Sequence, residues 1–235
     1  MKAKLLIKFL ALILVAGALP AMANSIPILL GPLVPVGSCV PTTAWTCAGP
    51  STVVAAVPGL GTITMTGFKP WPSTPGNIGV TLDSNSSSFV PYVGITGGNN
   101  QDEIDLQTPE VLQMTFSKAV TVTTLNLNKL FVAGVRGDTN VEIAAVNYLF
   151  NGSFLGTSFF FGTQNGMLTV NNPFGSALID TLQFWAVPTS SATDASNSDF
   201  GVSALTVTPV PEPGTLLLLG SGLAAIAARR RRKSS

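Results

Sequence analysis

Between residues 52 and 208 the chain alternates short apolar runs with polar and glycine-rich breaks, and almost no stretch has a helical period. A period of two is clearest at Leu112, Met114 and Phe116, which Gln113 and Thr115 separate. This alternation is typical of strands with one buried face. Strands are therefore expected at Thr52–Val57, Gly61–Phe68, Ile78–Leu82, Phe89–Ile95, Val111–Phe116, Val120–Leu127, Val141–Phe150, Ser153–Phe161, Met167–Val170, Leu178–Val187 and Phe200–Thr208.

Two Asn-Gly pairs, Asn151-Gly152 and Asn165-Gly166, separate apolar runs and indicate two-residue hairpin turns. Residues Tyr148 to Phe161 should form one hairpin, and Asn172 to Gly175 another turn. Many short strands without intervening helices predict a mainly β fold with antiparallel sheets. The expected architecture is two sheets packed as a sandwich resembling a jelly roll.

The first 23 residues have the three parts of a signal peptide. Lysines occupy the stretch before Phe9, an apolar run extends to Leu19, and the small residues Ala21 and Ala23 follow Pro20. A signal helix in residues 1–23, cleaved after Ala23 by signal peptidase, is therefore expected.

The C-terminal segment, residues 209–235, has a different three-part pattern. It contains Pro211, Glu212 and Pro213, then an apolar run of 14 residues from Thr215 to Ala228. As a helix this run would measure roughly 21 Å, against a hydrocarbon core of about 30 Å. Its terminal position and its lack of a polar face favour a short membrane helix at 215–228 over a buried core helix. The cations that follow form a stop-transfer signal: Arg229, Arg230, Arg231, Arg232 and Lys233.

These three parts, in this order, resemble the PEP-CTERM sorting tail of exported bacterial proteins, also known as the ice-binding protein C-terminal domain. The resemblance implies that the tail holds the protein in the inner membrane. It also implies that an exosortase-type membrane protease then cuts near Pro211, Glu212 and Pro213. The resemblance covers only about residues 209 to 233.

The segment between signal and tail, residues 24–208, is expected to be one exported domain, here called the cargo domain. The formal net charge of the whole chain is +1, but only four of its basic residues lie between Asn24 and Pro209, against ten acidic ones. The net charge of about −6 argues against nucleic acid or anionic lipid as a partner. Gly97 to Thr208, which ends in the strand Asp199-Phe200-Gly201-Val202, loosely resembles lectin-like and carbohydrate-binding sandwiches.

The start of the cargo domain, residues 25–58, contains several prolines and suits an extended or edge segment better than a central strand. It also holds both cysteines of the chain, Cys39 and Cys47. In an oxidising compartment this close pair is expected to form a disulfide.

Catalytic chemistry has few candidates, because the chain has no histidine. Ser-His-Asp triads, Cys-His pairs and the usual zinc sites are therefore not expected. A glycoside hydrolase needs two carboxylates across a cleft, and the spacing of Glu103, Glu110, Asp180 and Asp199 singles out no pair. A protein that is not an enzyme is expected, with a secreted carbohydrate-active enzyme as an alternative.

Two ligand sites are considered. A calcium site could use Asp102, Glu103 and Asp105 with Asp199, although a solvated acidic loop is the favoured explanation of the first three. No other cofactor is expected.

Trp71 lies between two prolines and is a candidate for stacking on a sugar ring, with packing as the alternative. Packing is expected for Trp45 and Trp185. Threonines alternate at Thr62, Thr64 and Thr66, but no repeat suggests an ice-binding array.

The sequence thus favours a non-enzymatic binding or structural protein at the cell surface or in the extracellular polysaccharide. A calcium-stabilised adhesion or matrix protein is a second alternative.

Overall fold

The structure is a computed structural model that describes residues 24–34, 46–48, 50–69, 72, 76, 78–81, 92–95, 103–106, 110–135, 140–188, 198–210, 220–224 and 226. The chain divides into two units. The larger, here called the body, is Ser25–Pro209, and the other combines Met1–Asn24 with Val210–Ser235.

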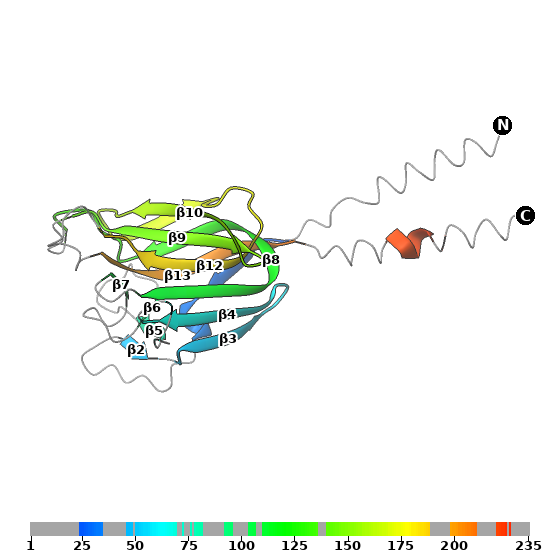
Figure 1. The fold of residues 1–235 in the computed structure, drawn as a ribbon, viewed down its shortest axis with the longest axis horizontal. Coiled ribbons are helices and arrows are strands. Elements are labelled where there is room, and N and C mark those ends of the chain that lie inside the picture. The colour runs from blue at the N-terminus through cyan, green and yellow to red at the C-terminus, as the bar shows by residue number, and fades with distance from the viewer. Residues whose placement is uncertain are drawn as a thin grey trace, which may run out of the picture. The chain divides into compact units, whose positions relative to one another are not determined.

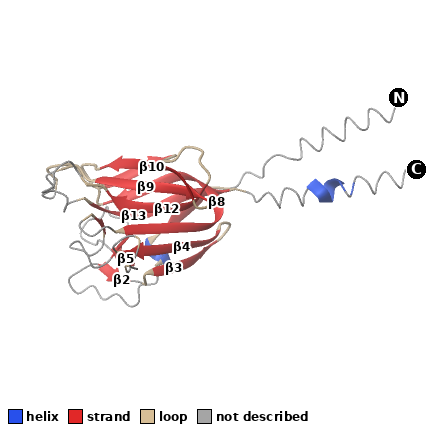
Figure 2. Cartoon of the chain, viewed as in Figure 1, coloured by secondary structure: helices blue, strands red, loops and turns tan. Residues whose placement is uncertain are grey.

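The described part of the body is mainly β (Figures 1 and 2). Its one helical element is the short 3-10 helix η1 (Gly31–Leu33). The strands are β1 (Ile26–Leu29), β2 (Thr46–Ala48), β3 (Thr52–Val57), β4 (Gly61–Phe68), β5 (Ile78–Thr81), β6 (Tyr92–Ile95), β7 (Ile104–Asp105), β8 (Val111–Asn128), β9 (Ile143–Phe150), β10 (Ser153–Phe161), β11 (Met167–Asn171), β12 (Ile179–Ala186) and β13 (Asp199–Pro209). All pairs between these strands are antiparallel. The predicted fold class is confirmed at this level.

The strands join into one 13-stranded sheet whose main order is β10-β9-β12-β8-β13-β6-β5-β2. Strand β4 pairs with β8 and carries β3, β11 also pairs with β8, and β1 and β7 pair with β13. The observed pairing is thus continuous, and the packing of two sheets as a sandwich or jelly roll stays a prediction.

Strand β8 connects two groups of strands. Its first part, Val111 to Phe116, pairs with β4 and β12, and its second part, Val120 to Asn128, pairs mainly with β13 and β11. The sequence predicted two strands here, broken after Phe116. That boundary is wrong, because the chain passes through a bulge at residues 117–119 and continues as the same strand.

Ser117 stabilises this bulge. Its hydroxyl oxygen accepts a hydrogen bond from the Thr62 backbone N–H at 2.8 Å and lies 3.5 Å from the Leu60 carbonyl oxygen. The bulge is therefore tied to the turn between β3 and β4. Gly61 is needed there, since its φ is +103° and an added Cβ would lie 2.4 Å from the Ser117 hydroxyl.

The alternation read from the sequence separates a buried from a half-buried face. In β12, Leu182 and Phe184 are fully buried in the core, whereas Gln183 between them is half-buried. In β8, Met114 is fully buried and its neighbour Gln113 is half-buried. The core is one continuous cluster that includes side chains from both parts of β8. Burial of these apolar side chains is the main source of stability in such a fold.

The hairpin predicted over Tyr148–Phe161 is confirmed. Asn151 and Gly152 both have positive φ, 50° and 73°, as a type I′ turn requires, and β9 pairs with β10. The second Asn-Gly pair does not make a hairpin, because the strand after it, β11, pairs with β8 and not with β10. Gly166 instead lets the chain pass the Phe131 ring, which an added Cβ would approach to 2.4 Å. The predicted turn at Asn172–Gly175 is present, with the Gly175 N–H bonded to the Asn172 carbonyl at 3.2 Å.

The two ends of the body lie on neighbouring strands. β1 contains Pro27 and, among the described strands, pairs with β13 alone, which agrees with the edge segment expected from the prolines. Ile26 is opposite Val207, and the hydroxyl oxygens of Ser25 and Thr208 are 3.0 Å apart. The chain thus enters and leaves the body side by side.

In the other unit, residues 220–224 and 226 are helical. Among the residues with a described structure, no helix is long and apolar enough to cross a membrane. The signal helix expected at 1–23 and most of the apolar run 215–228 lie outside the described residues.

Candidate functional site

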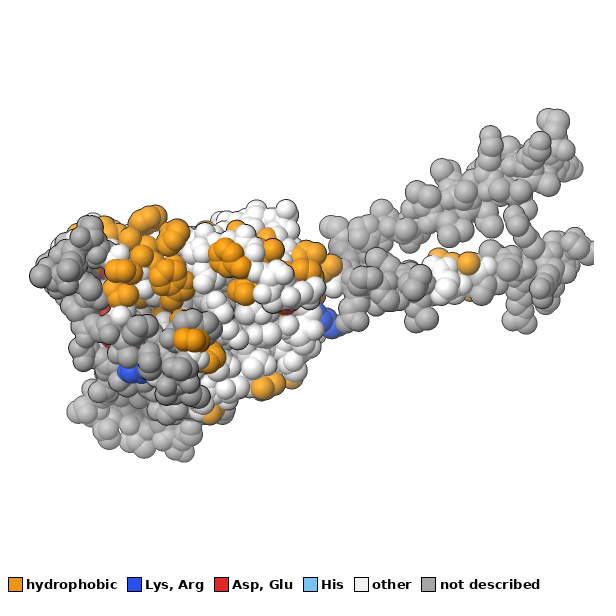
Figure 3. All heavy atoms as spheres, in the orientation of Figure 1, with side chains coloured by type: hydrophobic (Ala, Val, Ile, Leu, Met, Phe, Trp, Pro, Cys, Tyr) orange, Lys and Arg blue, Asp and Glu red, His pale blue; other side chains and the backbone are white. Residues whose placement is uncertain are grey.

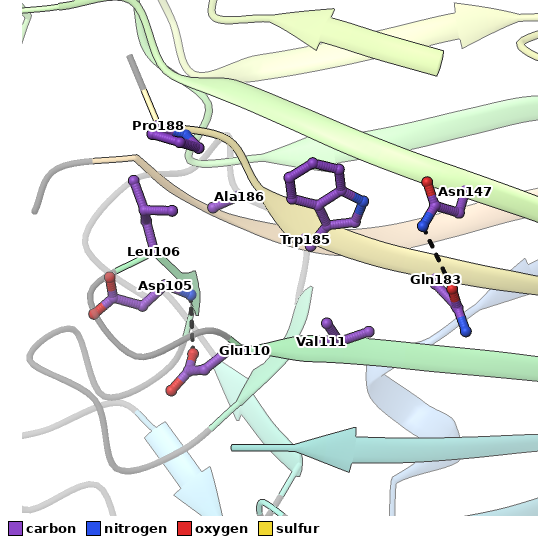
Figure 4. Close-up of a pocket in the computed structure, with 9 residues that line it drawn as sticks. All are labelled: Asp105, Leu106, Glu110, Val111, Asn147, Gln183, Trp185, Ala186 and Pro188. Atoms are coloured by element: carbon purple, nitrogen blue, oxygen red, sulfur yellow. Dashed lines mark hydrogen bonds between the residues drawn. The ribbon is translucent and has the colours of Figure 1, made fainter. Parts of the chain in front are cut away.

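The body contains a cavity of about 300 Å³ next to the first residues of β8 and the last residues of β12 (Figure 4). Four separate segments of the chain supply its walls. The lining residues are Asp105, Leu106, Glu110, Val111, Asn147, Gln183, Trp185, Ala186 and Pro188. Pro188 is exposed, so the cavity reaches the surface there.

One wall of the cavity belongs to a row of polar side chains across four strands, here called the polar row: Thr157, Asn147, Gln183 and Gln113. The register of the strands places each of these residues opposite the next one in the row. The Thr157 hydroxyl donates to the Asn147 side-chain oxygen at 2.7 Å, the Asn147 amide to Gln183 at 3.4 Å, and the Gln183 amide to Gln113 at 3.0 Å. The row holds the amides of Asn147 and Gln183 in fixed positions at the cavity wall.

Trp185 stands next to this row, two residues beyond Gln183 on the same face of β12. Its backbone is opposite Ala145, so it is a diagonal neighbour of Asn147. Its indole Nε1 is buried and has no hydrogen-bond partner among the described residues. Figure 4 shows this nitrogen on the side of the ring that faces Asn147. A buried donor without an acceptor is costly, so its presence at a cavity wall indicates a site for an acceptor.

Glu110 forms part of the opposite wall. Its Oε2 accepts the Asp105 backbone N–H at 2.9 Å, and its Oε1 lies 3.2 Å from the Lys69 ammonium nitrogen. Burial raises the pKa of Glu110 from its usual 4.5 to about 7, although the hydrogen bond from Asp105 and the ion pair with Lys69 both lower it. Both carboxyl oxygens are therefore engaged by the protein itself.

Glu103 is buried in a similar way. Its Oε1 accepts the Tyr92 hydroxyl at 3.3 Å and lies 3.9 Å from the Lys129 ammonium nitrogen. Glu142, also buried, accepts the Phe131 backbone N–H. Asp180 accepts the Asn151 backbone N–H at 2.5 Å and the Thr181 hydroxyl at 3.0 Å. These carboxylates fasten strands and turns to one another.

The structure brings together two of the residues considered for calcium. Asp105 of β7 is directly opposite Asp199 of β13, and both are buried. Asp102 lies outside the described residues, and within the described ones no group of three or more acidic, cysteine or histidine side chains could hold a metal ion. The calcium site stays a prediction.

Several other predicted residues cannot be placed. Ala21, Ala23, Cys39, Trp45 and Trp71 lie outside the described residues, and only the backbone of Cys47 is described, in β2. The same holds for the tail residues Pro211, Glu212, Pro213, Arg229, Arg230, Arg231, Arg232 and Lys233. The cleavage site, the disulfide and the sugar-stacking role of Trp71 stay predictions.

The sequence assigned Trp185 to packing, whereas the structure places it on the half-buried face at a cavity wall. The sequence did contain a signal for this position. Trp185 follows Thr181 and Gln183 at every second residue of β12, so it lies on the face opposite to the buried Leu182 and Phe184. Its nearness to Glu110 and Asp105 had no sequence signal, since these residues are far apart along the chain.

The tail matches a known protein family. Residues 209–232 match the family model of the PEP-CTERM protein-sorting motif. The chain therefore carries a PEP-CTERM sorting motif. This motif supports export and sorting by an exosortase-type system, as the resemblance of the tail had implied.

The comparisons over the body name no activity. No curated protein matches the sequence. A solved structure of a DUF4465 family protein from Bacteroides caccae ATCC 43185 is similar at 10% sequence identity and a TM-score of 0.44, over 79% of this chain and 99% of that one. At that TM-score the similarity carries no argument about the body.

Proposed function

We propose that this chain is an exported protein that its tail anchors transiently in the inner membrane. An exosortase-type protease then sorts it to the cell surface or the extracellular polysaccharide. The observation that carries this proposal is the PEP-CTERM match at residues 209–232, which begins at Pro209, the last residue of β13. The sorting motif thus follows the folded sheet without a spacer.

The physical chemistry of the tail supports transient anchoring. Proline disfavours a helix and lacks a backbone N–H, so Pro211 and Pro213 suit a segment that a protease must bind. The apolar run from Thr215 to Ala228 is short for a bilayer, and the five cations after it hold the C-terminus on the cytoplasmic side.

For the body we propose a non-enzymatic binding or structural role. We also propose that its strands form two packed layers that β8 joins. In support, alternate residues of both parts of β8 enter one core. Three carboxylates considered for hydrolysis, Glu103, Glu110 and Asp180, are held by their own protein partners. The raised pKa of Glu110 alone would suit a general acid, and this favours a carbohydrate-active enzyme as the alternative.

A calcium-stabilised adhesion or matrix protein is the second candidate. It is favoured by the opposed, buried pair Asp105 and Asp199, because a hard cation could bridge two carboxylates that otherwise repel each other. A rise in melting temperature with calcium that Asp199→Asn abolishes would favour this candidate, and no rise would exclude it.

The sorting proposal is tested by fractionating cells that produce the protein with an epitope placed before Pro209. Glu212→Ala should insert normally but resist processing, so that the full-length form accumulates in the membrane fraction. Replacing the five cations by Gln should weaken retention in the membrane, because positive charge fixes the stop-transfer orientation. Release of Glu212→Ala as efficient as that of wild type would contradict the proposal.

A further inference from the structure

We propose that the cavity beside Trp185 binds the terminal sugar of a neutral polysaccharide. This inference rests on the proposed binding role of the body and names the class of ligand and its place. It is carried by the buried indole N–H, by the two fixed amides of the polar row and by the size of the cavity.

The size limits the ligand. A volume of about 300 Å³ is at the lower end of the range for small-molecule sites, roughly 300–1,000 Å³. It suits one sugar ring and not an extended oligosaccharide within the cavity. Exposed Pro188 marks the side on which the rest of a polysaccharide would continue into solvent.

The hydrogen-bonding groups fit a polyhydroxylated ring. The Trp185 Nε1–H is a donor that is buried without an acceptor in the described part of the chain. Asn147 and Gln183 each have a second amide hydrogen beyond the one used in the polar row. A sugar hydroxyl both accepts and donates, so it can satisfy the indole and amide donors together.

The charge of the cavity selects a neutral sugar. Two carboxyl groups, of Asp105 and Glu110, line the wall, and the body is acidic overall. An anionic sugar would have to approach these groups although no lysine or arginine is among the described residues that line the cavity, and the nearby Lys69 ammonium is paired with Glu110. The Glu110 carboxyl is not open to a cationic amino sugar, because Lys69 already occupies its Oε1 and the Asp105 backbone N–H its Oε2.

Binding should be measured by titrating the mature protein, purified with its tail in detergent, with neutral hexasaccharides. The probes are cellohexaose, maltohexaose, laminarihexaose and mannohexaose, with hexagalacturonate and chitosan hexamer as charged comparisons. We expect at least one neutral probe to bind and neither charged probe to bind more tightly. Failure of all four neutral probes, or preference for a charged one, would overturn the inference.

Trp185→Phe keeps an aromatic ring and removes the N–H. It should weaken the binding of the neutral probe about tenfold, as expected for a lost hydrogen bond in a buried site. The melting temperature of the free protein should be unchanged or higher, because the removed donor has no partner there. Unchanged affinity in this variant would overturn the inference, and a purely structural role of Trp185 would instead lower the melting temperature.

A second pair of variants does not depend on Trp185. The amide of Gln183 lines the cavity, whereas the amide of Asn171 does not. Gln183→Ala should weaken binding, and Asn171→Ala, which removes an exposed amide of β11 outside the cavity, should leave it close to wild type. Equal losses in both variants would contradict the inference. The fractionation of each variant shows whether sorting is intact, so a failure of sugar binding is distinguishable from a failure of the sorting proposal.

Discussion

The tail and the body of this protein hold functional information in different forms. In the tail this information is linear, because Pro211, Glu212 and Pro213, an apolar run and a basic cluster follow one another within residues 209–233. In the body the cavity combines residues from Asp105 to Pro188, and only strand pairing brings them together. Changes in the body should therefore alter stability or binding without altering processing, and changes in the tail should do the reverse.

The largest effect expected within the body concerns Glu110. Burial raises the pKa of its carboxyl to about 7, so the folded protein holds a proton that the unfolded chain releases above pH 4.5. The stability contribution is thus fully present below pH 4.5 and is lost as the pH rises through about 7. The loss should reach about 3 kcal/mol, from the usual 1.36 kcal/mol for each pKa unit.

Glu110→Gln, which resembles the protonated acid, should flatten this part of the pH profile in denaturant unfolding. Lys69→Met should move the loss to higher pH, because Lys69 lowers the pKa of Glu110. If the free energy of unfolding of Glu110→Gln falls between pH 4.5 and 7 as steeply as that of wild type, another group is responsible. Processing of the tail should be the same in all three proteins.

A smaller effect is expected at the bulge of β8. Ser117→Ala removes the acceptor of the Thr62 N–H and should lower the free energy of unfolding by about 1 kcal/mol. Ser176→Ala, at an exposed turn position, is the control and should change it little. Equal stability of the two variants would mean that Ser117 does not hold the bulge.

The strands could be predicted because hydrophobic alternation is local. Thr52–Val57, Gly61–Phe68 and Ser153–Phe161 were predicted with the bounds that the structure shows. The prediction failed where tertiary pairing decides: the bulge at 117–119 does not end β8, and the two-residue strand β7 is too short to leave a pattern. β1 was expected only as part of an extended or edge segment, and it forms because an edge strand tolerates the missing N–H of Pro27.

The cavity could not be predicted for a related reason. Its polar row depends on β12 lying between β8 and β9, so that Gln183 faces both Gln113 and Asn147. Nothing in the local sequence specifies this order of strands. The carboxyl group of Glu110 was recognised as a candidate, but its burial and its pairing with Lys69 come only from the fold.

The central claim, that the tail directs sorting and is then removed, is tested most directly by intact-mass analysis of the protein recovered from the cell surface. The account predicts a chain that starts at Asn24 and ends between Pro209 and Gly214, without Arg229 to Lys233. Surface protein that still carries Lys233 would contradict it.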